Sequence, residues 1–206
     1  MFGTQNLGLF LLSCIALTMT PGQDTLHILT RSATQGRRAG LVAVAGIITG
    51  CFVQTFAAAF GLSAIVAASH TAFLAVKWLG AAYLVFLGAQ LVFAKPRGEI
   101  APGVMDHAET WPIYRAGLFC NLSNAKTILF YLSFLPQFVA PESVNKTGSL
   151  IFLGCFFSVV GTLWCFVIVG ASSLVARRLR TTPAIGTWIQ RGAGVLFVCL
   201  GVGLAV

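Results

Sequence analysis

The sequence predicts an all-α integral membrane protein with six transmembrane helices, arranged as two inverted three-helix repeats. The chain of 206 residues is 57% hydrophobic and only 9% charged, whereas soluble domains carry about 25% charged residues. Its apolar runs are long and lack the alternation of barrel strands. Its Lys and Arg residues gather in alternate loops, the pattern that orients membrane helices.

Six apolar segments are candidates for spans, because a helix needs about 20 residues to cross a bilayer. The sixth is short unless it starts near Ala184. Together the segments occupy most of the chain, which predicts a single transmembrane domain, residues 1–206, without a large soluble part. The predicted spans are residues 7–29, 41–67, 72–93, 116–139, 150–175 and 192–206.

The first span is interrupted by the polar sequence Thr20-Pro21-Gly22-Gln23-Asp24. Pro21 lacks an N–H and Gly22 is permissive, so a helix break is expected here. Thr20 as N-cap, with Gln23 three residues later, would form a capping box for a half-helix that begins inside the membrane. Asp24 is the single acidic residue in any predicted span, and such a group needs a cavity or a partner. The alternative is a static kink with a carboxylate near the membrane edge.

The loops predict the orientation. The second loop carries no Lys or Arg and the fourth carries only Lys146. The positive-inside rule therefore places loops one, three and five in the cytoplasm and both termini outside. The net charge of +8 is explained by this topology, so no nucleic-acid partner is expected. The Lys and Arg residues of the three basic loops are Arg31, Arg37 and Arg38, then Lys95, Arg97 and Arg115, then Arg177, Arg178 and Arg180, with Arg191 close behind.

A Pro-containing loop, residues 94–115, separates repeat one (about 1–93) from repeat two (about 116–206). Three spans per half is an odd number, so related halves would have opposite orientations. The spacing from Gly40 to Gly46 recurs from Gly148 to Gly154. In transporters, inverted repeats place the substrate site near the bilayer midplane, at the repeat interface.

The fourth span begins with a second interruption, Asn121-Leu122-Ser123-Asn124-Ala125-Lys126. Ser123 or Asn124 is a candidate cap for a second half-helix. Lys126 is the single charge between Arg115 and Glu142. It either faces Asp24 as a buried cation or extends to the cytoplasmic interface.

Other polar residues in the spans have two readings each. Gln54 is either a site residue or an interhelical hydrogen-bonding group. Tyr83 either offers its hydroxyl to a substrate or packs in the core. His27 either relays protons with Asp24 or lies at the interface near Arg31.

The six cysteines lie in apolar segments without a C-x-x-C pair, which favours free packing thiols over a disulfide framework or metal site. No metal or other cofactor is expected. The cysteines are Cys14, Cys51, Cys120, Cys155, Cys165 and Cys199.

Four stretches give the chain a resemblance to the lysine exporter superfamily, in its homoserine/threonine and leucine exporter branch. Residues 21–24 are similar to the Pro-Gly-Pro-Asp/Asn motif of that family, and residues 77–88 to its third-helix signature. Residues 121–126 resemble its Asn-Pro-Lys motif, and residues 134–138 resemble the Pro-Gln-Phe sequence that ends its fourth helix. Gln23 and Ala125 stand where the family usually has proline, so a changed substrate or a less active protein would fit.

The resemblance implies a bacterial inner-membrane protein that exports amino acids or their derivatives from the cytoplasm by proton antiport. The few charged residues in the spans favour a small neutral amino acid as the substrate of this secondary transporter. Its partners would be the amino acid, protons and membrane lipid, with a homo-oligomer possible. In this interpretation the half-helix N-terminus holds the substrate carboxylate and Asp24 faces the ammonium group or carries the coupling proton. The predicted substrate-binding residues are Thr20, Pro21, Gly22, Gln23, Asp24, Gln54, Tyr83, Asn121, Asn124 and Lys126.

Two other classes stay open. A membrane scaffold or assembly subunit would use its small-residue stripes for packing and Asp24 as part of a static kink. A thiol- or metal-handling membrane protein would use the six cysteines, but their separation in sequence argues against it. The sequence shows no nucleophile-and-base pattern and no phosphate-binding glycine loop, so an enzyme is not expected.

Overall fold

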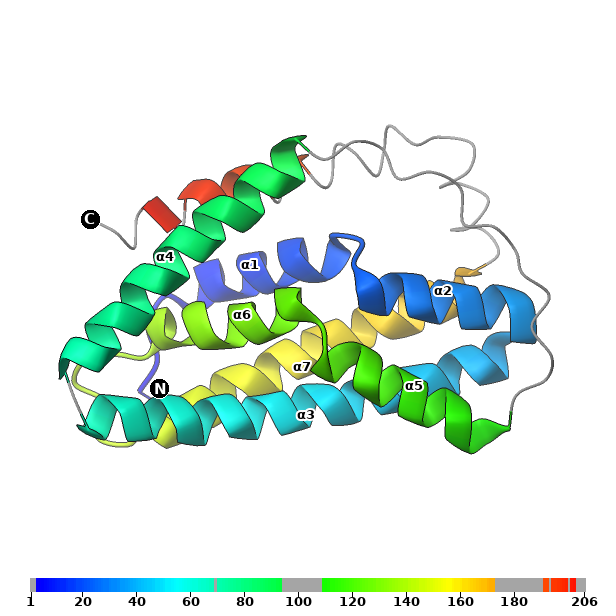
Figure 1. Cartoon of the computed structure of the whole chain (residues 1–206), viewed down its shortest axis with the longest axis horizontal. Helices are drawn as coiled ribbons and strands as arrows, with labels where there is room; N and C mark the ends of the chain where they lie inside the picture. Colours follow the sequence, from blue (N-terminus) through cyan, green and yellow to red (C-terminus); the bar gives the residue numbers. More distant parts are fainter. Residues whose placement is uncertain are drawn as a thin grey trace.

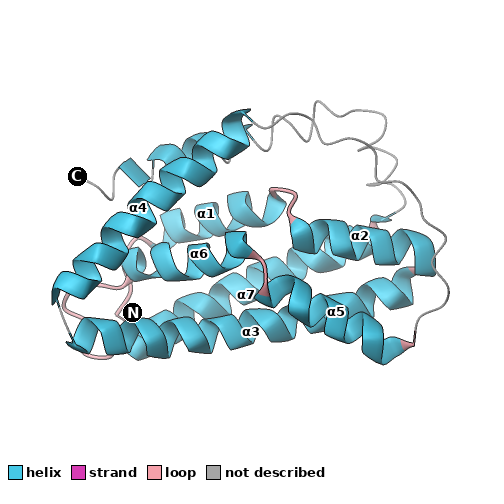
Figure 2. Cartoon of the chain, viewed as in Figure 1, coloured by secondary structure: helices cyan, strands magenta, loops and turns pink. Residues whose placement is uncertain are grey.

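The computed structural model describes residues 3–68, 70–93, 109–172, 191–192, 194–199 and 201–202. These residues are helical apart from short links, and they contain no strand beyond an isolated bridge between Thr4 and Val139 (Figure 2). The all-α class is as predicted. The elements are α1 (Leu7–Met19), α2 (Gln23–Gln35), α3 (Arg37–Ala68), α4 (His70–Phe93), α5 (Thr110–Leu122), α6 (Ala125–Ser133), η1 (Leu135–Phe138) and α7 (Lys146–Gly170), followed by helical residues between 191 and 202.

Two long, unbroken helices, α3 and α7, run along the molecule and pack against each other (Figure 1). Over them lie two broken helices. The α1–α2 pair and the α5–α6 pair run antiparallel (Figure 1). α2 packs beside α5, and α1 contacts α6 through Lys126 and Leu17. The bridge between Thr4 and Val139 joins the start of α1 to the residue after η1. The links between α1 and α2 and between α5 and α6 both lie near the middle of the molecule (Figure 1).

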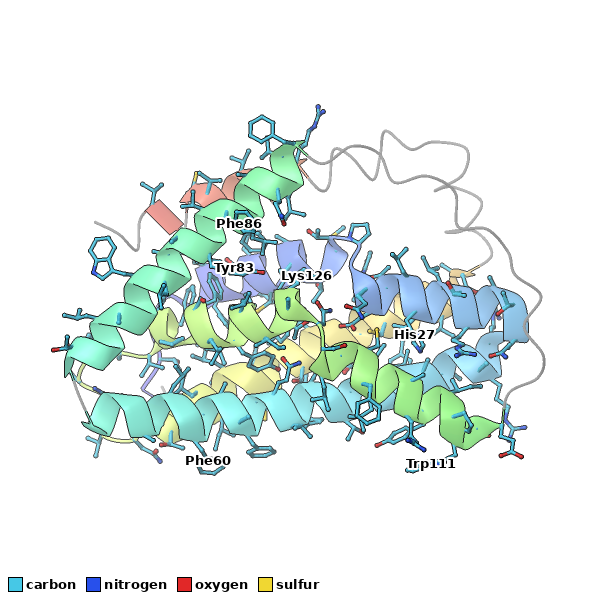
Figure 3. All side chains as sticks on the ribbon, viewed as in Figure 1. His27, Phe60, Tyr83, Phe86, Trp111 and Lys126 are labelled. Atoms are coloured by element: carbon cyan, nitrogen blue, oxygen red, sulfur yellow. The ribbon has the colours of Figure 1, made fainter. Side chains whose placement is uncertain are left out.

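Length and composition mark part of this bundle as membrane-spanning. Within the described residues, Arg37–Ala64 and Lys146–Gly170 are each long and apolar enough to cross a bilayer. The pair Thr110–Leu122 and Ala125–Phe138 meets the same criterion when its two helices are taken together, with a bend of 47° between them, as a broken span or a re-entrant loop would. Large apolar side chains such as Phe60 point outward (Figure 3), as a lipid-facing surface requires. The structure is thus that of a helical membrane protein, and the six-span arrangement stays a prediction.

The first predicted break is present, but its capping is different. The Thr20 hydroxyl donates to the Ala16 carbonyl at 2.8 Å, which makes Thr20 the C-cap of α1. The N-cap of α2 is Gly22, which has no side chain to donate or accept. The expected Thr20–Gln23 capping box is therefore wrong, because a threonine in the last turn of a helix bonds back to the carbonyl four residues earlier.

The second break is also present, although no proline enforces it. The Asn124 side chain caps α6 by accepting from the Lys126 backbone N–H at 3.1 Å. The Ser123 hydroxyl instead donates back to the Phe119 carbonyl at 2.7 Å. Of the two candidate caps, Asn124 is the one used. The helix before the break begins at Thr110 rather than at residue 116, so part of the predicted loop 94–115 is helical, and residues 94–108 lie outside the described part.

Glycines allow α3 to approach α5 closely. A Cβ on Gly46 would collide with the Tyr114 carbonyl oxygen and lie 2.8 Å from the Leu118 nitrogen. A Cβ on Gly117 would collide in turn with the Ala43 carbonyl. Small residues at such crossings let backbones touch, which is a main source of helix association in membranes. This crossing holds α5, and thus the second break, against α3.

We expect Gly46→Ala to destabilise the fold, because the obstruction is backbone and cannot rotate away. Overpacking of this kind costs about 1–3 kcal/mol. Gly61→Ala on the same helix is the matched control, because nothing lies within 4 Å of its added Cβ. The thermal unfolding midpoint of the purified protein should fall for Gly46→Ala and not for Gly61→Ala. Equal midpoints would contradict the close crossing.

Candidate functional site

The carbonyl groups left exposed by the first break receive hydrogen bonds from Lys126. Pro21 lacks the N–H that would pair with the Leu17 carbonyl four residues earlier. The Lys126 ammonium donates to the Leu17 carbonyl at 3.1 Å and to the Thr20 carbonyl at 3.0 Å. Figure 3 shows Lys126 at the gap between α6 and the α1–α2 link. A cation is favoured here by the negative end of the α1 dipole.

Gly22 makes room for that lysine. A Cβ on Gly22 would lie 3.0 Å from the Lys126 Nζ and 3.3 Å from its Cε. The Gly22 backbone is extended, with φ −128° and ψ −168°, so its conformation alone does not require glycine. A side chain at this position would crowd the end of the lysine, so glycine favours the contact between the two breaks.

Asp24 reaches in the opposite direction, to the last turn of α5. Its Oδ2 accepts a hydrogen bond from the Asn121 amide nitrogen at 3.0 Å, and Cys120 Sγ lies 3.6 Å from its Oδ1. The Asn121 carbonyl accepts from the Gln54 amide nitrogen at 2.7 Å. Asn121 is fully buried and has room because residue 50 is glycine, whose added Cβ would lie 2.7 Å from its Oδ1.

The two charged residues hold equivalent positions. Asp24 is the second residue of α2 and Lys126 is the second residue of α6. Each one contacts the helix that ends at the other break. The breaks are thereby joined by two reciprocal polar contacts, one from a carboxylate and one from an ammonium group.

A cavity of about 60 Å³ lies where the two breaks meet α3 and α7. It has room for a few water molecules, each of which needs about 10–15 Å³. Asp24 and Lys126 are the two charged residues among those that line it. The lining residues are Leu17, Thr18, Gly22, Asp24, Thr25, Ile47, Ile48, Cys51, Asn121, Asn124, Lys126, Thr127, Phe157, Ser158, Gly161, Thr162, Trp164 and Cys165.

The structure brings five of the predicted site residues to this cavity and leaves five outside its lining. Thr20 is buried and contributes its carbonyl to Lys126, with Pro21 beside it in the link. Gln54 lies behind Asn121, in the interhelical role. Tyr83 is on α4, partly buried against the main core (Figure 3). Gln23 is exposed and lines a separate groove. The five in the cavity are Gly22, Asp24, Asn121, Asn124 and Lys126.

The wall that α7 contributes to the cavity was not predicted from the sequence. Its cavity residues recur at helical spacing on one face, from Phe157 to Cys165. The signal was present in sequence as Ser158, Gly161 and Thr162, small or polar residues on one face of an otherwise apolar helix. The Trp164 indole nitrogen on this wall is buried and has no hydrogen-bond partner.

Three of the six cysteines lie in or next to the candidate site. Their positions far apart in the sequence gave no indication of this proximity. Cys51 and Cys165 line the cavity, and Cys120 contacts Asp24. All six thiols are free. Among the described residues, no group of three His, Cys, Asp or Glu side chains is arranged to hold a metal ion.

A wider groove of about 490 Å³ lies between α2 and α5. His27 and Arg31 line it from α2, and Cys120 and Ser123 line it from the other side. The His27 Nε2 is buried without a hydrogen-bond partner. Cys120 lines this groove and contacts Asp24, so Asp24 lies between the groove and the cavity.

Two broken helices thus enclose a small, mainly apolar cavity with one carboxylate and one ammonium group in its lining, an arrangement typical of membrane transporters. The chain matches the LysE type translocator family over residues 15–206 and belongs to that family. This confirms the resemblance found from the motifs.

Several bacterial relatives match over nearly their whole length. An uncharacterized membrane protein of Pseudomonas aeruginosa is 29% identical over 207 residues, which cover 98% of this chain and 96% of the relative. The leucine efflux protein of Enterobacter sp. (strain 638) is 27% identical, covering 99% and 97%. That of Salmonella typhimurium is 26% identical, covering 99% and 96%. No solved structure matches the chain.

We expect Lys126→Met to destabilise the protein, because the Thr20 carbonyl loses this donor and the Leu17 carbonyl keeps only the Thr20 backbone N–H. Unsatisfied buried polar groups cost about 1–3 kcal/mol. Lys146→Met is the matched control, since Lys146 is exposed at the start of α7. The measurement is the thermal unfolding midpoint of each purified variant. A midpoint for Lys126→Met equal to that of the control would show that the lysine does not stabilise the break.

Proposed function

We propose that this protein is a secondary transporter that exports a small neutral amino acid with an apolar side chain from the cytoplasm. The observation that carries the proposal is the cavity, which presents one carboxylate and one ammonium group within a mainly apolar wall. A neutral amino acid is a zwitterion and complements both charges. A cationic or anionic substrate would bring a like charge near Lys126 or Asp24.

The apolar wall supports an aliphatic side chain as the third recognised part. The apolar side chains that line the cavity together with Asp24 and Lys126 are Leu17, Ile47, Ile48, Phe157 and Trp164. The leucine efflux proteins among the relatives match over nearly the full chain. Leucine and its close analogues are therefore the substrates to test first.

The reciprocal contacts support an inverted repeat of two three-span halves, residues about 1–93 and 116–206. Asp24 and Lys126 occupy equivalent positions after equivalent breaks, and each reaches the other half. Inverted repeats place broken helices and the substrate at their interface. Membership in the family supports placement in a bacterial inner membrane, with both termini outside as the basic loops predict.

The cavity has room for a few waters, so we interpret the structure as a closed form. Substrate binding then requires the broken helices to move relative to α3 and α7. The groove between α2 and α5 supports a route from the cytoplasm, because the two helices on its sides carry the Asp24–Asn121 contact. Separation of that contact would join the groove to the cavity.

Asp24 is the proposed proton carrier of an amino acid/proton antiport. It is a carboxylate on the wall between groove and cavity, and carboxylates at such positions serve as proton relays in membrane transporters. Protonation would remove its charge and weaken its attraction for the substrate ammonium group. Proton binding and substrate binding would then exclude each other, which is the requirement for exchange.

The direct test of the proposed function is an export assay over neutral amino acids. Cells loaded with labelled leucine, isoleucine, valine, methionine or threonine should lose the label faster when they express this chain. The rate should depend on the pH gradient across the membrane. Unchanged efflux of every amino acid would overturn the proposal and favour a non-transporting scaffold.

Asp24→Asn keeps the shape of the side chain and removes its titration. We expect it to abolish uphill leucine transport driven by a pH gradient in proteoliposomes, and to slow exchange between equal concentrations, because a neutral residue 24 attracts the substrate ammonium group less strongly. Glu142→Gln is the control, because Glu142 is exposed after η1. Uphill transport by Asp24→Asn with a wild-type pH profile would exclude Asp24 as the proton carrier.

The orientation is tested with single cysteines in a cysteine-free chain. A membrane-impermeant maleimide should label Ser143→Cys in intact cells, since the loop after η1 is predicted to be external. It should label Gln35→Cys, at the end of α2, only after permeabilisation. The reverse pattern would invert the proposed topology.

A further inference from the structure

We propose that the N-terminus of α6 binds the carboxylate of the substrate, with the Asn124 amide nitrogen as its hydrogen-bond donor. This inference rests on the proposed function and assigns an orientation to the amino acid in the cavity. The sequence had instead suggested the N-terminus of α2 for the carboxylate. The two assignments differ in the half of the protein that holds each end of the substrate.

Asn124 has an oriented amide with one end unused. Its Oδ1 accepts from the Lys126 backbone N–H at 3.1 Å, which fixes which end of the amide is oxygen. Its Nδ2 is buried and has no hydrogen-bond partner. The residue is 4% exposed and lines the cavity. A buried donor without an acceptor costs about 1–3 kcal/mol, and a carboxylate in the cavity would remove that cost.

The electrostatic surroundings favour an anion at α6. Asn124 is the N-cap of α6 and so lies at the positive end of its dipole. The Lys126 side chain starts in the same turn, lines the same cavity and reaches across to the first break, where its ammonium group contacts the Leu17 and Thr20 carbonyls. A carboxylate bound there would accept a charge-assisted hydrogen bond, which is about twice as strong as a neutral one. The α6 N-terminus therefore supplies a donor and a dipole, and the Lys126 ammonium adds a positive charge to the same cavity.

The N-terminus of α2 is less suitable, because Asp24 already occupies its first turn. A substrate carboxylate at that position would be repelled by the Asp24 carboxylate, as two like charges in one site are. Asp24 is better matched to the substrate ammonium group. The amino acid then lies across the two breaks, with its ammonium group toward α2 and its carboxylate toward α6.

The substitution Asn124→Asp tests the amide donor of residue 124 separately from its role as the N-cap of α6. Aspartate caps helices as well as asparagine does, so the Lys126 N–H keeps its acceptor, while the amide donor is replaced by an anionic oxygen. The full-length protein in nanodiscs is titrated with L-leucine and with L-leucinamide, which has no carboxylate. We expect N124D to weaken leucine binding by about 10- to 100-fold, the effect of losing a hydrogen bond to a charged group, and not to weaken leucinamide binding.

Asn145→Asp is the matched control. Asn145 caps α7 through its side-chain oxygen, which accepts from the Gly148 N–H at 2.8 Å, and it lies outside the cavity lining. N145D should leave the affinities for both probes unchanged. An N124D protein that keeps the wild-type ratio of leucine to leucinamide affinity would overturn the inference, because a purely structural cap predicts that result. A wild-type protein that binds no neutral amino acid would instead overturn the proposed function.

Discussion

The centre of this structure depends on an amide hydrogen that proline does not have. Without it, the Leu17 carbonyl loses its partner four residues later and keeps only the Thr20 backbone N–H at 3.2 Å, in a setting where water is scarce. Lys126 supplies the hydrogen bonds from the other half of the chain, to Leu17 and Thr20. That contact brings the start of α6 to the end of α1, and Gly22 leaves the space for it. The cavity lies between two helix breaks, and hydrogen bonds from each half of the chain to the other hold the two breaks together.

The broken helices and the continuous ones have different mechanical roles. α3 and α7 are uninterrupted and pack on each other, so they resist bending. Each of the four half-helices has one terminus near the cavity. A few polar contacts join these termini, including the Asp24–Asn121 hydrogen bond of 3.0 Å. Such contacts can be exchanged for contacts with a ligand at little net cost, whereas the backbone contact at Gly46 cannot. Motion is therefore expected at the breaks, with α3 and α7 as the frame.

Much of this architecture could be predicted from sequence, because proline, glycine and isolated charges in apolar runs have few physical explanations. The break at Pro21, the cap at Asn124 and the helical class followed from such residues. The capping box failed because Thr20 had a competing acceptor in its own helix. The α7 wall and the cysteines around Asp24 were not predicted, because Ser, Thr and Cys are common in membrane helices and show their role only when another helix faces them. The pairing of Asp24 with Asn121 rather than with a nearby cation depended on how the halves cross, which single-sequence patterns do not encode.

Because Gly22 contacts Lys126, the residues tolerated at positions 22 and 126 depend on each other. A side chain at residue 22 would occupy the space that the Lys126 ammonium uses, since an added Cβ would lie 3.0 Å from it. A bulkier residue 22 becomes tolerable once residue 126 is shorter, and a lysine at 126 is favoured once residue 22 is glycine. Substitutions at these sites should therefore be inherited as a pair. In an alignment of related chains, this dependence would appear as covariation between positions in opposite halves.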